Sequence, residues 1–73
     1  MKQSDSRVGF VGVGRMGANM ARRLIDQQET IVALYDRDRA TATDLATELG
    51  CEAAATPARV AELAGIVFTV VSD

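Results

Sequence analysis

Three glycines placed between an apolar run and an amphipathic run constrain the fold of this chain more than any other feature. They lie at Gly12, Gly14 and Gly17, in the pattern G-x-G-x-x-G. The apolar residues 8–13 predict a strand that is covered on both faces and leads directly into this pattern. From Gly17 onward, small and apolar side chains recur at helical spacing, which predicts a helix that ends near residues 27–28. The sequence therefore predicts a strand–turn–helix unit around the glycines.

Strands and helices are predicted to alternate through the rest of the chain. β-Branched and apolar runs indicate the strands, whereas cap residues and the helical spacing of apolar side chains indicate the helices. The next predicted elements are a strand at 30–35 and a helix that is capped by Asp38 and ended by Gly50. The inner face of this helix consists of Ala42, Leu45, Ala46 and Leu49. A very short strand within 51–55, a helix that starts at Thr56 and Pro57 and is ended by Gly65, and a strand at 66–71 complete the predicted order.

This order of elements predicts an α/β fold with a parallel sheet. Right-handed crossovers would arrange the four strands in the order 3-2-1-4, as in a Rossmann-type domain with helices on both faces of the sheet. Residues 1–73 are therefore interpreted as one partial dinucleotide-binding domain, truncated after the fourth strand. That strand, at 66–71, would be an open apolar edge, which natural proteins normally pair or cover. We expect either a longer chain that completes the domain or self-association through this edge.

Composition excludes several classes of function. With a net charge of −2 and a pI of about 4.9, the chain lacks the basic surface that nucleic-acid binding requires. No run approaches the roughly 20 apolar residues of a membrane span. The chain has no histidine and its carboxylates are dispersed, so we expect no metal site. Its single cysteine, Cys51, is interpreted as a small buried hydrophobe and fits a reducing, cytoplasmic location.

Each glycine of the pattern has a physical role if the ligand is a dinucleotide. Gly12 permits a tight turn, Gly14 lets the backbone approach a pyrophosphate, and Gly17 lets helix and strand pack closely. The free N–H groups and the dipole at the helix start attract the phosphates. Asp36 lies 19 residues after Gly17, at the end of the second predicted strand, where its carboxylate can accept hydrogen bonds from an adenosine ribose. These residues together predict a dinucleotide site.

Four further side chains near the predicted site have more than one interpretation. Arg37 could cover an adenine face, hold a 2′-phosphate or be solvated, and the sequence leaves all three open. Arg15 lies inside the glycine pattern and has a phosphate role, through its backbone N–H more than through its side chain. Met16 is a candidate to line the site, whereas Met20, one turn further along the helix, is expected to pack in the core.

The segment 9–21, GFVGVGRMGANMA, resembles the N-terminal signature of the β-hydroxyacid dehydrogenase family. That family includes 3-hydroxyisobutyrate, tartronate semialdehyde and 6-phosphogluconate enzymes. Three further segments agree with it in order and spacing, namely LYDR at 34–37, TPA at 56–58 and IVFTVVSD at 66–73. The methionine inside the glycine pattern makes this match considerably more specific than the glycines alone.

The resemblance implies a nicotinamide cofactor that exchanges a hydride with a small 3-hydroxyacid or its semialdehyde or oxo partner. It implies that residues 12–17 hold the pyrophosphate, that Asp36 and Arg37 meet the adenosine, and that the backbone around Val71 and Ser72 lies near the cofactor. Because Asp36 would repel a 2′-phosphate, NAD is favoured, while Arg37 keeps NADP open. In a whole enzyme of this family, an all-helical domain follows that binds substrate and builds the dimer.

Two features depart from the family pattern. The family commonly has a glycine and a histidine or tyrosine before the second strand, where this chain has Gln28 and Glu29, so we expect an altered turn. The family's substrate-binding serine with its glycine pair, and its catalytic lysine, would lie beyond residue 73. No catalytic residue is therefore assigned to this chain, and residues 1–73 alone are predicted to be inactive.

Three other functions share the same glycine pattern. One is a non-enzymatic nucleotide-binding module with a regulatory role, which would need no catalytic partner. A second is a flavoprotein, against which the bulk of Met16 and the downstream matches argue. The third is a half-domain whose exposed edge strand pairs with a second copy. The continuation of the chain would discriminate the enzyme from the regulatory module.

Overall fold

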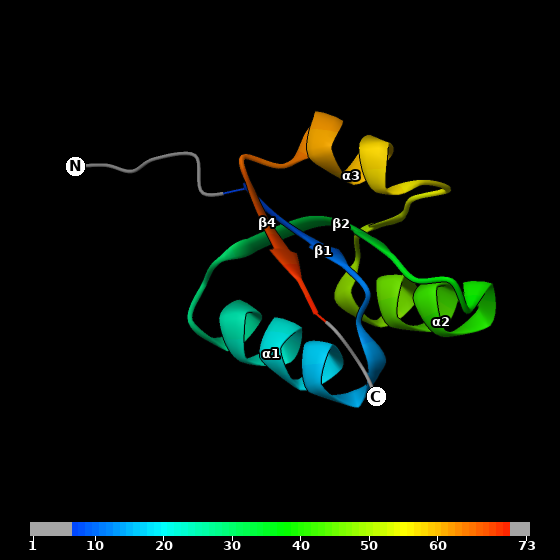
Figure 1. Ribbon diagram of the computed structural model, residues 1–73. Coiled ribbons are helices and arrows are strands. Elements are labelled where there is room, and N and C mark those ends of the chain that lie inside the picture. Colours follow the sequence, from blue (N-terminus) through cyan, green and yellow to red (C-terminus); the bar gives the residue numbers. More distant parts are fainter. Residues whose placement is uncertain (1–6, 71–73) are drawn as a thin grey trace.

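Strands and helices alternate along the chain in a computed structural model that describes residues 7–70 (Figure 1). The predicted order of elements is confirmed. The first strand ends two residues before the predicted boundary because Gly12, with a φ of 77°, turns the chain out of the sheet. The elements are β1 (Arg7–Val11), α1 (Gly14–Asp26), β2 (Thr30–Tyr35), α2 (Arg39–Leu49), β3 (Glu52–Ala53), α3 (Pro57–Leu63) and β4 (Ile66–Thr69).

The four strands form one parallel sheet in the order β3-β2-β1-β4, as predicted. The pairing of β1 with β2 contains one irregularity, because Val8 pairs with Ile31 whereas Gly9 pairs with Ala33. The extra residue in β2 is Val32. Ile31 and Leu34 consequently belong to the same core cluster, although a regular strand would place them on opposite faces.

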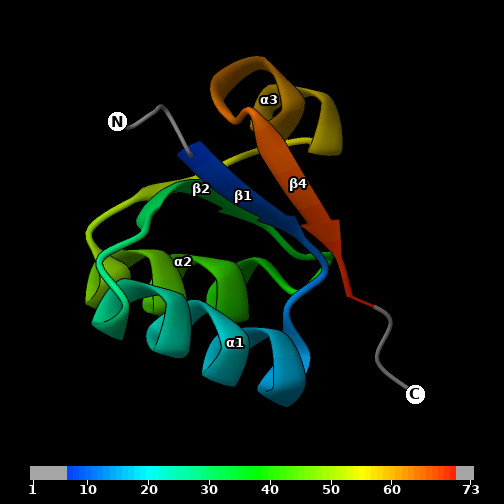
Figure 2. The ribbon, with the colours of Figure 1, turned by 90° about the vertical axis from the view of Figure 1, so that its left-hand side faces the viewer.

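Helices cover both faces of the sheet, with α1 and α2 on one face and α3 on the other (Figure 2). The larger core cluster lies between the sheet and the first pair of helices, and the smaller one lies under α3. Phe10 and Leu34 are the largest fully buried side chains. The larger cluster consists of Val8, Phe10, Val13, Ala21, Ile31, Leu34, Ala42, Leu45 and Ala46, and the smaller of Ala33, Ala54 and Val60.

Gly9 allows α3 to approach β1 closely. A Cβ atom added at Gly9 would overlap Cγ1 of Val60 and lie 3.0 Å from Cβ of Ala64. Val60 is fully buried as a result of this approach. Gly9 stands just before the glycine pattern, and its role has no local signal in the sequence because it depends on the packing of α3 against β1.

The amino ends of α2 and α3 carry the predicted caps. The side chain of Asp38 accepts a hydrogen bond from the N–H of Thr41 at 3.2 Å, and Thr56 Oγ1 accepts one from the N–H of Arg59 at 3.1 Å. At the carboxyl end of α2, Gly50 has a φ of 74°, the left-handed conformation predicted there. These three local predictions are confirmed.

Two helix ends differ from expectation in detail. Helix α3 ends at Leu63, and Ala64 is already extended, so Gly65 lies two residues beyond the last helical residue. Its N–H donates a hydrogen bond to the carbonyl of Arg7 at 2.8 Å. At the carboxyl end of α1, Gln28 has a φ of 67°, a left-handed conformation that favours glycine. Gln28 thus adopts a conformation that glycine would adopt without strain, and an altered turn at this point stays a prediction.

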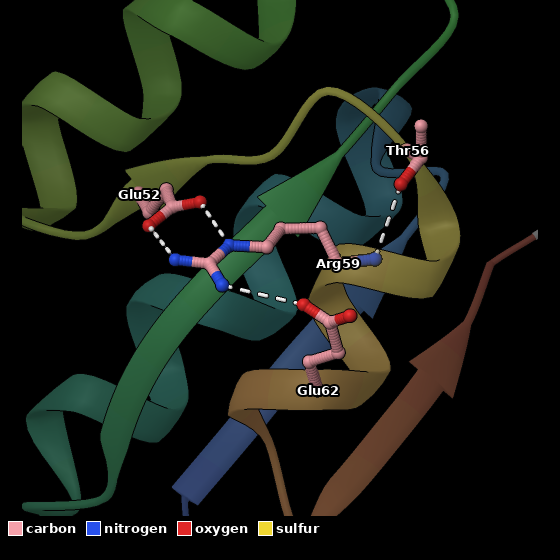
Figure 3. Close-up of polar contacts among 4 residues, drawn as sticks. All are labelled: Glu52, Thr56, Arg59 and Glu62. Atoms are coloured by element: carbon pink, nitrogen blue, oxygen red, sulfur yellow. Dashed lines mark hydrogen bonds and ion pairs between the residues drawn. The ribbon is translucent and has the colours of Figure 1, made fainter.

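Arg59 connects the two-residue strand β3 to α3 (Figure 3). Its guanidinium donates to both carboxylate oxygens of Glu52, at 2.9 and 3.3 Å, and to Oε1 of Glu62 at 3.3 Å. The three side chains are largely exposed, so water screens the attraction and the contribution of these ion pairs to stability is small. They link α3 to β3, an edge strand of two residues.

Strand β4 is the most exposed strand of the sheet, so the open apolar edge predicted at 66–71 is present over its described residues. Ile66, Val67 and Phe68 are 47%, 38% and 36% exposed. Within residues 7–70, β4 pairs with β1 alone. The ring of Phe68 packs on Phe10, with ring centroids 5.5 Å apart. An apolar edge of this kind is a surface that sheets normally cover.

The described residues can be compared with two predictions from composition, namely that the chain has no membrane span and no metal site. Among the described helices, none is long and apolar enough to cross a bilayer, and within residues 7–70 no three His, Cys, Asp or Glu side chains group as metal ligands.

Cys51 packs against the larger core cluster. Burial, with a smaller contribution from the charge of Glu52, raises the pKa of its thiol to about 11, so this thiol is protonated at neutral pH.

Candidate dinucleotide-binding site

The predicted site residues surround the carboxyl ends of the strands, where ligands bind in open parallel sheets. The chain runs from β1 to β2 on one side and later returns to β4 on the other, so the end of β1 is the point where the strand order reverses. A cleft of about 310 Å³ opens there. Its lining consists of Val11, Gly12, Tyr35, Asp36, Arg37, Thr69 and Val70.

Gly12 lies at the floor of this cleft and has two independent reasons to be glycine. Its φ of 77° is in the left-handed region, which side chains rarely adopt. A Cβ atom there would also overlap the carbonyl oxygen of Val70, at the end of β4. The N–H of Gly12 donates to the carbonyl of Tyr35 at 2.7 Å, which ties the turn to the end of β2. The predicted tight turn is present.

Gly14 and Gly17 shape the first turn of α1. Gly14 has a φ of 50°, also in the left-handed region, and begins the helix. Gly17 is buried, and a Cβ atom added to it would lie 3.2 Å from Cβ of Val13 and 3.4 Å from the carbonyl oxygen of Gly12. Gly17 therefore packs closely against the turn, whereas the prediction was close packing between helix and strand.

The amino end of α1 differs from those of the other helices. Its cap position is Val13, whose apolar side chain cannot accept a hydrogen bond from the first turn. As in α2 and α3, no acidic side chain lies in the first turn, so the absence of a side-chain cap is what distinguishes α1. The first N–H groups of a helix need an external acceptor, and the helix dipole makes this end attractive to anions. The end of α1 is thus suited to a phosphate group.

Asp36 is half-buried at the end of β2, and backbone N–H groups hold its carboxylate. Oδ2 accepts a hydrogen bond from the N–H of Val13 at 2.9 Å, and Oδ1 accepts one from the N–H of Asp38 at 2.9 Å. Burial opposes ionisation, but the backbone hydrogen bonds and the charge of Arg37 outweigh it and hold the pKa of this carboxyl below its usual value. Asp36 is therefore ionised at neutral pH.

The remaining site predictions have different outcomes. Arg37 is exposed and lines the same cleft as Asp36. Arg15 is exposed in a neighbouring cleft of about 480 Å³ between α1 and α2. Met16 is 67% exposed at the start of α1, whereas Met20 packs against the core as expected. Val71 and Ser72 lie outside the described residues.

Sequence reasoning overlooked three residues that line the main cleft: Tyr35, Thr69 and Val70. They stand at or just after the ends of β2 and β4. Because the carboxyl ends of parallel strands meet at one edge of a sheet, their position in the predicted elements was the available signal.

The described residues fit a bound dinucleotide. The turn carries no side chain at its three glycines, the start of α1 has no side-chain cap, and the Asp36 carboxylate retains lone pairs beyond those that backbone N–H groups use. Hydroxyl groups of a ribose are suitable donors to those lone pairs. The arrangement thus provides complementary partners for a phosphate and a ribose next to each other.

Comparison with known proteins agrees with this geometry. The family model for the NAD binding domain of 6-phosphogluconate dehydrogenase matches residues 7–73. The chain belongs to this family of Rossmann-type domains, and its cofactor is NAD(P).

The relatives carry several names. A probable 3-hydroxyisobutyrate dehydrogenase-like 3, mitochondrial, from Arabidopsis thaliana is 36% identical over 70 residues, which are 96% of this chain and 21% of the relative. A cytokine-like nuclear factor N-PAC from Danio rerio is 34% identical over 96% of the chain and 15% of the relative. An uncharacterized oxidoreductase YfjR from Bacillus subtilis is 36% identical over 92% of the chain and 23% of the relative. The chain thus spans about a quarter or less of the length of these relatives.

Proposed function

We propose that this chain is the cofactor-binding part of an oxidoreductase that transfers a hydride between NAD(P) and a small 3-hydroxyacid or its semialdehyde or oxo partner. The observation that carries the proposal is the meeting of the glycine turn, the start of α1 and the Asp36 carboxylate in one place, at the carboxyl ends of β1 and β2. Relatives named as a dehydrogenase-like protein and as an oxidoreductase support the reaction class.

In this proposal the backbone of Gly12, Gly14 and Gly17, together with the N–H of Arg15, holds the pyrophosphate. Oxygen atoms of a pyrophosphate accept from such N–H groups, and glycine lets them approach the backbone. Met16, exposed beside the turn, covers part of the bound cofactor with its apolar side chain.

The adenosine is assigned to Asp36 and Arg37, which line one cleft. Because the carboxylate of Asp36 is ionised at neutral pH, it accepts hydrogen bonds from ribose hydroxyls and repels a 2′-phosphate. Arg37 would attract that phosphate, but as an exposed side chain it acts through water. NAD is therefore the proposed cofactor, with NADP bound more weakly.

The rest of the reaction is assigned to a longer protein. The nicotinamide ring supplies the hydride when it is bound, and the protein orients the ring and excludes water. The backbone around Val71 and Ser72 is proposed to lie along the cofactor. The acid–base group, the substrate pocket and the homo-oligomer contacts are proposed to lie in segments beyond residue 73, so this chain binds the cofactor without turning substrate over.

The test is a calorimetric titration of the protein with NAD and with NADP. Gly14→Ala should weaken NAD binding by about tenfold or more, because it strains the turn and places a methyl group toward the phosphates. Gly50→Ala is the matched control, since Gly50 has the same left-handed backbone but open space around it and lies at the far end of α2. Unchanged affinity in Gly14→Ala, or no binding by the wild type, would contradict the proposal.

A second candidate function is a nucleotide-binding module without catalysis, as in the alternative considered from sequence. Support comes from the relative named a nuclear factor, whose name includes no dehydrogenase. Both candidates predict NAD binding. Hydride transfer by the longer protein, assayed with a panel of small 3-hydroxyacids, discriminates them because only the enzyme reduces the cofactor.

A further inference from the structure

The carboxylate of Asp36 closes the junction between the end of β2 and the glycine turn. The N–H of Gly12 bonds to the carbonyl of Tyr35 at 2.7 Å and continues the backbone ladder between β1 and β2. At the next residue the chain has already turned away from the sheet. There the N–H of Val13 bonds to Oδ2 of Asp36 at 2.9 Å, so a side chain replaces the backbone acceptor that a strand would supply.

We propose that Asp36 is a positioning residue for the phosphate-binding turn, in addition to its contact with the ribose. This inference rests on the proposed function and deepens it. The carboxylate fixes Val13, which stands between Gly12 and Gly14, and thereby fixes the direction in which the two glycines present their backbone. Its other oxygen holds the N–H of Asp38 at 2.9 Å, so the same group also sets the turn that leads into α2.

Burial makes this carboxylate hard to replace. Val13 is only 1% exposed, so water has poor access to its N–H once the carboxylate is removed. A buried donor without an acceptor is unfavourable, and the turn would shift to find another partner. Ribose recognition and turn geometry therefore depend on one side chain, and a substitution meant to admit a 2′-phosphate would also disturb the pyrophosphate site.

The test uses inorganic pyrophosphate, a probe that has no ribose. Asp36→Asn removes a negative charge near the phosphate site, so a role limited to charge and ribose contact predicts that pyrophosphate binds as well or better. A positioning role predicts the opposite, because the asparagine NH2 group faces one of the two backbone donors and cannot accept from it. We expect pyrophosphate affinity to fall by about threefold or more and NAD affinity to fall further.

Asp38→Asn is the matched control. It removes the same charge two residues away, and asparagine caps a helix as well as aspartate does, so α2 is preserved. This variant should bind pyrophosphate at least as tightly as the wild type. If Asp36→Asn behaves like Asp38→Asn toward pyrophosphate while losing NAD, the positioning role is overturned and the proposed function remains.

Hydrogen exchange on the wild-type protein needs no variant and covers the case in which Asp36→Asn fails to fold. The amide of Val13 should exchange as slowly as that of Leu34 inside β2, although Val13 lies outside any strand. Exchange as fast as at exposed turn amides would overturn the positioning role. A wild-type protein that binds neither NAD nor pyrophosphate would overturn the proposed function, and the positioning role with it.

Discussion

The ends of α1 and α2 are built in opposite ways. Helix α2 begins with an aspartate cap and ends at a left-handed glycine, the arrangement that satisfies both ends of a helix from within. Helix α1 begins with glycine and an apolar cap position, and the left-handed residue after it is Gln28. The difference shows that the end of α1 is not optimised for the helix itself. Its amino end is held from outside by Asp36 and is left open toward the cleft.

Two left-handed glycines make the same comparison at the level of one residue. Gly12 and Gly50 have φ angles of 77° and 74°, yet a Cβ atom would overlap the carbonyl oxygen of Val70 at the first position and meet nothing within 4 Å at the second. Backbone conformation alone therefore requires glycine at position 50, whereas at position 12 the close approach of the Val70 carbonyl oxygen requires it as well.

Gly12→Ala should have the largest effect on stability, because it adds steric overlap to backbone strain. We expect the free energy of unfolding to fall by about 2 to 4 kcal/mol. Gly50→Ala, which carries the strain alone, should cost about 1 kcal/mol. Urea denaturation of both variants measures the difference. Equal losses of unfolding free energy would mean that a Cβ atom at position 12 does not clash with the carbonyl oxygen of Val70.

Removal of a helix cap should cost less and should leave cofactor binding intact. Asp38→Ala and Thr56→Ala each leave a first-turn N–H without its acceptor, so each should lower the free energy of unfolding by about 1 kcal/mol. Both caps serve their own helices. A tenfold loss of NAD affinity in Thr56→Ala would contradict the claim that the amino end of α1, and not that of α3, binds the cofactor.

Gln28→Gly should stabilise the protein, since it gives α1 the carboxyl end that α2 already has. Relief of the left-handed strain outweighs the added freedom of the unfolded chain, for a net gain of about 0.5 to 1 kcal/mol in thermal denaturation. Gln27→Gly provides the control, because Gln27 has a φ of −91° and gains nothing from glycine. A loss of stability in Gln28→Gly would contradict the assigned strain.

The smallest expected effect is a pH dependence that comes from Asp36. Its pKa is lower in the folded protein than in the unfolded chain, so its contribution to stability is present above the usual carboxyl range and is lost as the pH falls through the folded pKa. Asp36→Asn should therefore make the acid limb of the stability profile shallower. Denaturation midpoints measured from pH 6 downward test this, and an unchanged acid limb would contradict the assigned hydrogen bonds.

Local signals in the sequence predicted most of the fold. Caps, a glycine helix end and β-branched runs depend on neighbouring residues, and so the order of elements, the 3-2-1-4 sheet and the ends of α2 were all predicted correctly. The bond from Val13 to Asp36 joins residues 23 positions apart, and the role of Gly9 depends on α3. Neither has a local signal. The exposure of β4, by contrast, was predicted from its place at the edge of the 3-2-1-4 strand order.

The most direct test of the account is to map NAD binding onto the backbone amides by NMR. The account predicts that the largest changes in amide shift occur at Gly14, Arg15 and the end of β2 around Asp36, with α3 and the amino end of α2 after Asp38 little changed. Changes concentrated on α3, or none anywhere on addition of NAD, would contradict the claim that the open end of α1 holds the cofactor.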